Sequence, residues 1–415
     1  MLKSYLALAW KVLFRRKFFT FISLFGIAFT LVVLTVVTAL VDAVVAPHPP
    51  ETKHDRTVGI YYAQLRGEHW RRNGSAGYAM LDQHARNLPN VEQLAMASWA
   101  EVVVSYLNGQ RIESHLKRTD GAFWRVLEFE FLEGGPFTEA DVRDGRFVAV
   151  INETTRRRFF GGQPALGRTL EADGQRFTVV GVVPDVPFLR FVPFSDIWTP
   201  ITTTKSDGYR REVVGGLMGI LLLEDPDKLA LTRDEFWSRL KTMQVDDPAG
   251  VEHVEATPET VTDTLGRMFL AGGTGVGHGY GRRLQVALAV AALLFMLLPA
   301  VNLVNLNTSR IMERASEIGV RKAFGASART LVGQFVVENL VLTLVGGITG
   351  FALAAWVLSV VNGSGVIPYA DLRLNYRVFG WGLLLALVFG LLSGVYPAWR
   401  MSRLHPVQAL KGAAR

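Results

Sequence analysis

Charged side chains of both signs gather in one short stretch of the chain, SEIGVRKAFGASARTLVGQFVVENL at residues 316–340. Glu317 and Arg321 are four residues apart with the acid first, which is the favourable order for an ion pair on a helix. Gly325 would end that helix, and Ser327 would cap the next one. The stretch therefore predicts a charged helical elbow, whose chemistry suits the docking of a partner. An ordinary solvated helical hairpin explains the same residues equally well.

Sequence patterns of the common catalytic sites are absent from the chain. It contains no G-x-x-x-x-G-K-[ST] phosphate loop, no H-E-x-x-H zinc motif and no G-x-S-x-G nucleophile motif. Its 8 histidines are scattered without metal-ligand spacing, and it has no cysteine, which excludes thiol catalysis and disulfides. We expect a non-catalytic protein that itself holds no cofactor and no metal.

Long apolar runs predict that the chain is a membrane protein. Hydrophobic residues make up 49% of the composition, and four runs are long enough to span a bilayer. The first run is too long for the apolar part of a signal peptide and is followed by no clear cleavage site, so it reads as a signal anchor. The four predicted transmembrane helices, one N-terminal and three C-terminal, cover residues 18–45, 284–309, 330–361 and 378–399.

Basic residues flank these runs unevenly. Segments 1–17, 310–329 and 400–415 together hold 14 basic and 2 acidic residues. The positive-inside rule therefore places both termini and the 310–329 segment in the cytoplasm, and residues 46–283 and the short loop 362–377 outside. This charge indicates contact with anionic lipid rather than nucleic acid. Residues 1–17 are expected to form an amphipathic helix on the inner membrane face, or simply a basic flank.

The external segment 46–283, called the ectodomain below, mixes strand-like and helical patterns. Asn108-Gly109 and Asp173-Gly174 each stand between extended runs, which is a strong signal for a two-residue hairpin turn. A helix is expected from Ala76 to Asn87. The pattern predicts an α+β ectodomain of two lobes, with residues of about 120–210 inserted as the second lobe.

Polar and small residues inside the predicted spans are candidates for helix contacts. For Asn302 and Asn305, three residues apart, bonding between helices is favoured over a place in a transport path. Glu338 would cost on the order of 3 kcal/mol as an ion in hydrocarbon, and a structural role near the interface is favoured over a proton relay. Close packing is expected at two pairs of small residues, Gly346 with Gly350 and Gly390 with Gly394.

Several segments resemble the MacB/FtsX family of ABC-transporter permeases. The stretch RASEIGVRKAFGASARTLVGQFVVENLVLTLVGGITG is similar to the family's signature between its second and third spans. The tail YPAWRMSRLHPVQALKG at residues 396–412 resembles the family's C-terminal ending, with Met401 where a small residue is usual. FVAVINETTRRRFFGGQPALGRTLEADGQRFTVVGVVPDV at residues 147–186 resembles the family's periplasmic-core motif. The resemblance covers nearly the whole chain.

The resemblance implies a four-span permease of the bacterial inner membrane with a periplasmic domain. Such permeases work as dimers and transmit movement from a cytoplasmic ATPase, which binds the ATP and Mg. Because only 17 residues precede the first span, we expect the ATPase to be a separate chain, and the dimer to contain two identical or two related permeases. The implied ATPase-coupling residues are Glu313, Arg314, Glu317, Arg321, Lys322, Gly325 and Ser327, with Arg400, Arg403 and Pro406 of the tail nearby.

The function expected from this resemblance is export or efflux driven by the ATPase, with a periplasmic adaptor and an outer-membrane duct as further possible partners. The alternative is that the same kind of ATPase-driven complex releases lipoproteins or activates cell-wall hydrolases, as the resemblance implies for other relatives. A membrane sensor or structural protein without an ATPase is the alternative from another class.

Overall fold

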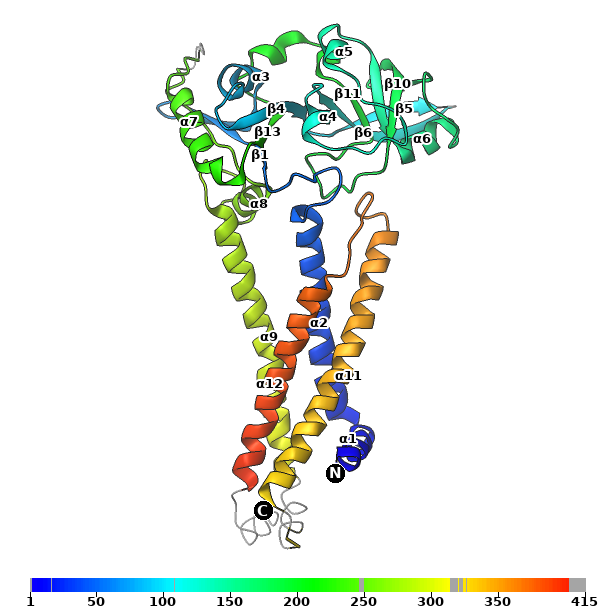
Figure 1. Cartoon of the computed structure of the whole chain (residues 1–415), viewed down its shortest axis with the longest axis vertical. Helices are drawn as coiled ribbons and strands as arrows, with labels where there is room; N and C mark the ends of the chain where they lie inside the picture. Colours follow the sequence, from blue (N-terminus) through cyan, green and yellow to red (C-terminus); the bar gives the residue numbers. More distant parts are fainter. Residues whose placement is uncertain are drawn as a thin grey trace. The chain divides into compact units, whose positions relative to one another are not determined.

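The computed structural model (Figure 1) describes residues 2–15, 17–107, 109–245, 250–313, 320, 324–325 and 327–402. The chain divides into two compact units, which are described separately. The helical unit contains residues 1–42, 287–364 and 372–415, and the ectodomain unit contains residues 43–286 and 365–371. Of the external loop predicted at residues 362–377, the central part, 365–371, belongs to the ectodomain unit.

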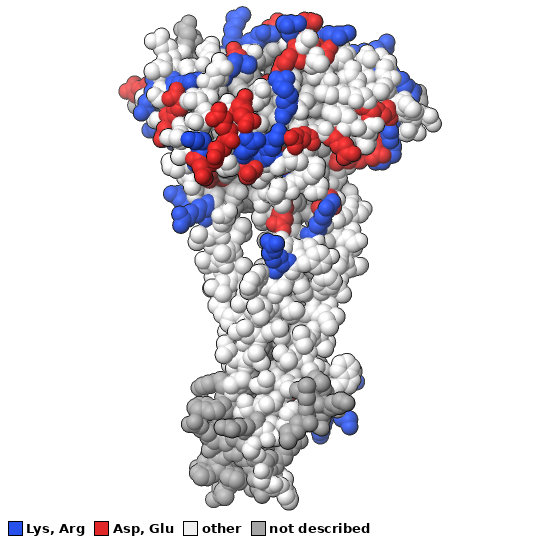
Figure 2. Space-filling view, viewed as in Figure 1, with Lys and Arg blue, Asp and Glu red and all other residues white. Residues whose placement is uncertain are grey.

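The helical unit consists of long apolar helices preceded by the short helix α1 (Leu2–Arg15). Within the described part of the chain, α2 (Lys17–Val45), α9 (Tyr280–Glu313) and α11 (Ala328–Gly363) each contain a run long and apolar enough to cross a membrane. The apolar part of α12 (Tyr376–Ser402) is shorter, so a fourth span stays a prediction. On the face drawn in Figure 2, these helices show few charged side chains along their middle lengths.

The ectodomain is organised by one mixed sheet of 14 strands. Its main path runs β14-β2-β3-β13-β4-β6-β11-β8-β10-β7, with β11 parallel to β6 and β10 parallel to β8. The strands are β1 Thr57–Ile60, β2 Ala63–Arg66, β3 Arg71–Ala76, β4 Val91–Ser98, β5 Glu101–Leu107, β6 Gln110–Thr119, β7 Glu133–Gly134, β8 Val148–Asn152, β9 Thr169–Ala172, β10 Gln175–Val183, β11 Ile197–Pro200, β12 Val214–Gly215, β13 Leu217–Leu223 and β14 His253–Ala256.

Short helices connect these strands. They are α3 Tyr78–Met80, the π-helical turn Leu81–Ala85, α4 Phe123–Val126, α5 Glu139–Arg143, α6 Glu153–Phe160, α7 Leu229–Lys241 and α8 Val261–Leu270, with 3-10 turns at Ile201–Thr203, Asp207–Arg211 and Pro226–Lys228. The helix expected from Ala76 begins only at Tyr78, because Ala76 ends strand β3, where it pairs with Val214 and Leu217.

Both predicted hairpins are confirmed. Leu107 pairs with Gln110, the residues that flank the first predicted turn, while Asn108 itself lies outside the described residues. Ala172 pairs with Gln175, and the two turn residues Asp173 and Gly174 have φ values of 53° and 69°. Positive φ at both central residues is what a type I′ turn requires, and Asp and Gly tolerate it.

Two hydrophobic clusters form the ectodomain core, but they do not follow the predicted lobe boundary. The larger cluster includes Phe123 and Trp198, which lie inside the range expected for the inserted lobe. The smaller cluster centres on Phe177 and takes Val103 and Leu116 from outside that range. The parallel pairing of β11 with β6 makes the sheet continuous here, so the second cluster is the smaller part of one unit.

Asp120 holds the end of β6 against neighbouring backbone. Its Oδ2 accepts a hydrogen bond from Met96 N at 3.0 Å, and its Oδ1 accepts one from Phe123 N at 3.0 Å. Burial, assisted by the nearby carboxylate of Glu139, outweighs these hydrogen bonds and raises the pKa of Asp120 to about 7. The folded protein therefore retains a proton here at pH values where the unfolded chain has released it.

We predict that this proton makes stability depend on pH. A carboxyl pKa that is raised in the folded state gives stability that is full below pH 4 and is lost as the pH rises towards about 7. Across that window the loss is on the order of 4 kcal/mol. Asp120→Asn removes the titration, so thermal unfolding in mild detergent should show the wild type losing Tm relative to this variant from pH 4 to 7. Exposed Asp207→Asn is the control, and parallel pH profiles for wild type and Asp120→Asn would contradict the prediction.

Candidate functional site

The coupling elbow, residues 310–329, begins in the last turn of α9, which ends at Glu313, and ends in the first turn of α11, which starts at Ala328. Gly325 has φ +88°, a left-handed conformation that glycine adopts without strain. Ser327 is the N-cap of α11, and its Oγ accepts a hydrogen bond from Thr330 N at 3.2 Å. Ser327 therefore caps α11 as the sequence predicts, whereas the helix that Gly325 was predicted to end lies largely outside the described residues.

The charged residues assigned to ATPase coupling lie largely outside the described residues, so their role stays a prediction. This applies to Arg314, Glu317, Arg321, Lys322, Arg403 and Pro406, while Arg400 is described only as part of α12. Two apolar elbow residues outside the expected coupling set are described and exposed, Val320 and Phe324. Their only signal in the sequence is that they are apolar within a charged segment, which is a composition suited to contact with another protein.

A buried polar face surrounds Glu338 on α11. The Glu338 side chain is only 2% exposed, and the sequence reasoning missed its polar neighbours. Four-residue spacing places them on one side of the helix. Asn305 on α9 is exposed, so in this chain it does not join that buried group, and the Asn302 side chain lies outside the described residues. The buried polar neighbours on α11 are Gln334, Asn339 and Thr343.

Glycines lie where the long helices approach one another. A Cβ on Gly346 would lie 3.0 Å from the Ile27 side chain of α2, and one on Gly350 would lie 3.2 Å from the backbone of Ala28. On α12, a Cβ on Gly390 would lie 2.7 Å from Thr343 Oγ1 of α11. A Cβ at these positions would force its neighbours to shift, so the glycines allow the helices to pack closely. Gly394 follows one turn later in α12.

The external loop is held on the ectodomain by four polar residues, His115, Asn152, Asp196 and Tyr369, which we call the loop socket. Asp196 accepts hydrogen bonds from His115 N at 2.7 Å, His115 Nδ1 at 3.0 Å and Asn152 Nδ2 at 3.0 Å. The Tyr369 hydroxyl donates a further hydrogen bond to Asp196. Burial alone would raise the pKa of Asp196, but the bonds from His115 and Tyr369 outweigh it and lower the pKa below its usual value.

Backbone geometry adds to this attachment. Tyr369 has φ +53°, which is uncommon for a residue with a Cβ and persists only where the surroundings impose it. Next to it, Phe188 N donates a hydrogen bond to Pro368 O at 3.0 Å. The Phe194 ring packs at 4.8 Å from the His115 ring and 6.4 Å from the Tyr369 ring. The loop between α11 and α12 is thus fastened by polar, aromatic and backbone contacts.

A second attachment, which we call the exit clamp, holds the segment that follows α2. Arg190 and Glu51 form an ion pair at 2.9 Å in which each side chain is 5% exposed. The other arm of Arg190 donates a hydrogen bond to Ala46 O at 2.7 Å. Nearby, Lys117 is fully buried and donates to Phe191 O at 2.8 Å, and burial lowers the pKa of Lys117 to about 7.

A third attachment, the entry clamp, holds the first turn of α9. Asp263 in α8 accepts a hydrogen bond from Gly281 N at 2.9 Å and pairs with Arg233 at 2.9 Å. Four residues later, Arg267 forms a buried ion pair with Glu259 at 2.6 Å. Burial raises the pKa of Asp263, but the hydrogen bond from Gly281 and the charge of Arg233 outweigh it and lower the pKa.

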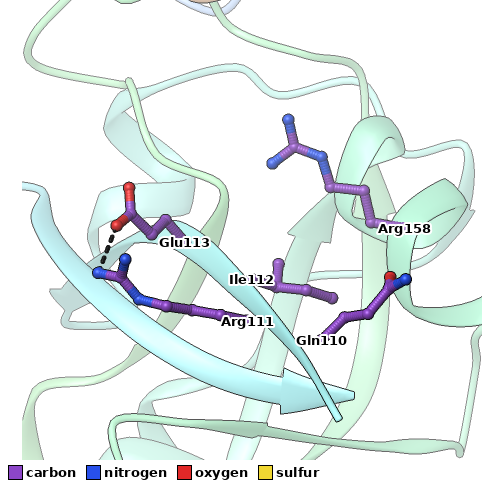
Figure 3. A pocket seen from close by; sticks show the side chains of 5 residues that line it. All are labelled: Gln110, Arg111, Ile112, Glu113 and Arg158. Atoms are coloured by element: carbon purple, nitrogen blue, oxygen red, sulfur yellow. Dashed lines mark ion pairs between the residues drawn. The ribbon is translucent and has the colours of Figure 1, made fainter. Parts of the chain in front are cut away.

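An open hollow of about 680 Å³ lies between β6 and α6 (Figure 3). Figure 3 shows Arg158 projecting from α6 on one side, and Gln110, Arg111 and Glu113 along β6 on the other. Arg111 and Glu113 form an ion pair with each other at 2.6 Å. The lining is polar but its charges are partly paired, and among the described residues no group of three His, Cys, Asp or Glu is placed to hold a metal.

Comparison with known families agrees with these features. Residues 20–238 match the model of the MacB-like periplasmic core domain, and residues 289–406 match that of the FtsX-like permease C-terminal domain. The chain belongs to the MacB/FtsX-like family of ABC transporter permeases. The resemblance predicted from the elbow, tail and core motifs is therefore confirmed at the level of the family.

Relatives within this family differ in length. The chain is 22% identical to the uncharacterized ABC transporter permease YknZ of Bacillus subtilis, over 82% of this chain and 81% of YknZ. It is 27% identical to the macrolide export ATP-binding/permease protein MacB of Wolinella succinogenes, over 74% of this chain and 45% of MacB. It is 24% identical to the pyoverdine export ATP-binding/permease protein PvdT of Pseudomonas fluorescens, over 97% of this chain and 58% of PvdT. The chain thus spans about half the length of MacB and PvdT.

Two solved structures of related domains are similar to part of the chain. The extracellular domain of YknZ is 16% identical with a TM-score of 0.37, covering 48% of this chain and 99% of that domain. The periplasmic region of MacB from Actinobacillus actinomycetemcomitans is 16% identical with a TM-score of 0.39, covering 54% of this chain and 95% of that region.

We predict that the stabilities contributed by Arg190 and Glu51 of the exit clamp depend strongly on each other. Arg190→Met leaves the buried Glu51 without its counter-charge and should lower the free energy of unfolding by about 3–5 kcal/mol. The double variant Arg190→Met with Glu51→Leu should recover most of that loss, because it leaves no unpaired carboxylate buried there. Unfolding followed by tryptophan fluorescence in mild detergent measures both. As a control, Arg210→Met breaks the exposed pair with Asp207 and the contact with the Tyr209 ring, and should change stability by less than about 1 kcal/mol. Equal effects of Arg190→Met and Arg210→Met would show that the clamp is not coupled.

We also predict that the Tyr369 hydroxyl fastens the external loop. Tyr369→Phe removes one hydrogen bond to a buried carboxylate, a contribution of about 1.5–3 kcal/mol. Hydrogen exchange at Phe188 N, which bonds to Pro368 O, should then speed up by about tenfold or more. Tyr376→Phe at the exposed start of α12 is the matched control. Unchanged exchange at Phe188 in the Tyr369→Phe variant would show that the backbone contact holds the loop alone.

Proposed function

We propose that this permease is the membrane subunit of an ABC-type exporter and acts as a mechanical transmitter. In this function a cytoplasmic ATPase moves the coupling elbow, the membrane helices carry that movement, and the ectodomain converts it into work on a substrate outside. The permease itself performs no catalysis. Its partner ATPase binds ATP and Mg.

One observation carries the proposal. Three segments that connect the ectodomain unit to the long helices are each fastened by buried polar contacts: the exit clamp after α2, the entry clamp before α9 and the loop socket between α11 and α12. A domain that was only tethered to the membrane would not need an ion pair at 5% exposure beside its linker. Stiff linkers are what the transmission of force requires.

The names of two relatives support export as the direction of transport. Two of the relatives are described as a macrolide exporter and a pyoverdine exporter, each with an ATP-binding part in the same protein. For this chain we propose an ATPase bound at the coupling elbow and a dimer with a second copy or a related permease. The proposed location is the bacterial inner membrane, with both termini in the cytoplasm and the ectodomain in the periplasm, where an adaptor and an outer-membrane duct would continue the path.

Charge reversal at the elbow tests the coupling. Glu317→Lys replaces the acid of the predicted pair with Arg321, and should reduce both recovery of the ATPase with the purified permease and ATP hydrolysis by the complex, by about tenfold or more. Glu68→Lys makes the same charge change at an exposed ectodomain position and should have no effect. If the Glu317→Lys complex assembles and hydrolyses ATP like the wild type, the elbow is not the ATPase contact.

Purification from native membranes in mild detergent, followed by mass spectrometry, separates the candidate functions. An ABC ATPase together with a periplasmic adaptor supports export. An ATPase together with a lipoprotein carrier or a cell-wall hydrolase supports the alternative work of the family. Recovery of the permease with no ATPase, under conditions that keep a related complex intact, would support the sensor or structural class and reject the proposal.

A further inference from the structure

The C-terminal tip of α8 exposes three consecutive apolar side chains. Met268, Phe269 and Leu270 are 55%, 76% and 48% exposed, although the preceding turn is buried through Thr264 and Arg267. Consecutive residues on a helix point about 100° apart, so the three side chains span about 200°, a little over half of the circumference of the tip. Such a cluster is costly in water and marks a surface that is normally covered.

The tip has a fixed place beside the start of α9. A Cβ on Gly266 would lie 2.3 Å from Tyr280 O, so the two backbones touch at this glycine. The hydrogen bond from Gly281 N to Asp263 joins the same two segments. Met268 and Leu270 follow Gly266 by two and four residues, which is about 3–6 Å along the helix axis. All of these contacts lie within the ectodomain unit.

The first turn of α9 has the composition that is typical of a helix where it enters the membrane. The apolar run of α9 lies within Tyr280–Leu297, and the two exposed basic residues Arg282 and Arg283 come just before its first buried leucine, Leu284. The Arg283 guanidinium lies 5.5 Å from the centre of the Tyr280 ring. Tyrosine and arginine are typical of the headgroup layer, where arginine pairs with lipid phosphate.

The exit of α8 is braced, so the tip is held in place. Arg267 donates to both oxygens of Glu259, at 3.2 and 2.6 Å, and to Gly273 O at 2.8 Å. Its guanidinium also lies 4.5 Å from the centre of the Tyr62 ring. These bonds hold the chain on both sides of residues 268–270 and leave their side chains pointing outwards.

From this placement we propose that the tip of α8 inserts into the outer leaflet of the membrane as an interfacial anchor for the ectodomain. The occupant of the apolar surface is phospholipid: Met268, Phe269 and Leu270 enter the boundary of the acyl chains while Arg282 and Arg283 contact phosphate groups. The distance fits, because the headgroup layer is about 5–7 Å thick on each side and interfacial helices bury their apolar face by about 5–10 Å. The anchor is independent of the transmission function proposed above.

The lack of cysteine in the chain allows a direct test. Phe269→Cys is labelled with a nitroxide in the full chain, which is placed in nanodiscs of phosphatidylethanolamine and phosphatidylglycerol. Power-saturation EPR then compares collisions of the label with oxygen, which enters lipid, and with a water-soluble nickel chelate. Val290→Cys in the apolar run of α9 is the lipid control, and Tyr106→Cys on the exposed hairpin strand β5 is the water control.

The label at residue 269 should resemble the lipid control, with an oxygen-to-nickel accessibility ratio severalfold above that at residue 106. A ratio equal to that at residue 106 would overturn the proposal, because the tip would then lie in water. Shielding from both reagents would also overturn it, because protein and not lipid would then cover the tip. Met268→Cys repeats the measurement on the neighbouring side chain, so the result does not depend on one variant folding.

Discussion

A buried carboxylate is stable in a folded protein only where donors from other segments surround it, and Asp196 imposes this constraint on the ectodomain. Its side chain collects donors from β6, from the end of β8 and from the external loop. The residue directly precedes β11, which pairs in parallel with β6 and antiparallel with β8. The middle of the sheet and the loop between α11 and α12 are therefore fixed by the same charge.

The exit and entry clamps follow the same physical rule. In each, a charged side chain is taken out of water, which is unfavourable unless partners are held in good geometry. The partners come from sequence positions far apart, such as Arg190 with Glu51 and Arg233 with Asp263. Such pairs add little net stability compared with apolar packing, but they penalise any arrangement that separates their partners. They therefore make the attachments stiff, which is the property that a transmitter of movement needs.

Sequence reasoning correctly predicted the features of this protein that depend on local patterns. Apolar runs located the long helices, the Asn-Gly and Asp-Gly pairs located two hairpins, and the motif residues identified the family. It could not predict the loop socket, because Tyr369 is 173 residues from Asp196 and neither residue belongs to a recognisable sequence pattern. Nor could it predict which residues form the second core cluster, because the β6–β11 pairing that continues the sheet joins segments far apart in the sequence. The charged elbow residues were found by their helical spacing and assigned to ATPase coupling by the resemblance alone, and their side chains lie outside the described residues.

Packing within the helical unit is a further feature that supports the proposed transmission of movement. Gly346 and Gly350 bring α11 against α2 at a distance that leaves no room for even one added methyl group without a shift, and Gly390 does the same for α12 against α11. Close-packed interfaces deform little, so a displaced helix takes its neighbours with it or changes to another discrete packing. A flexible bundle would absorb a push at the elbow as side-chain rearrangement. In the proposed function, this tight glycine packing would instead carry the push to the ends of the helices, where the buried clamps would pass it to the ectodomain.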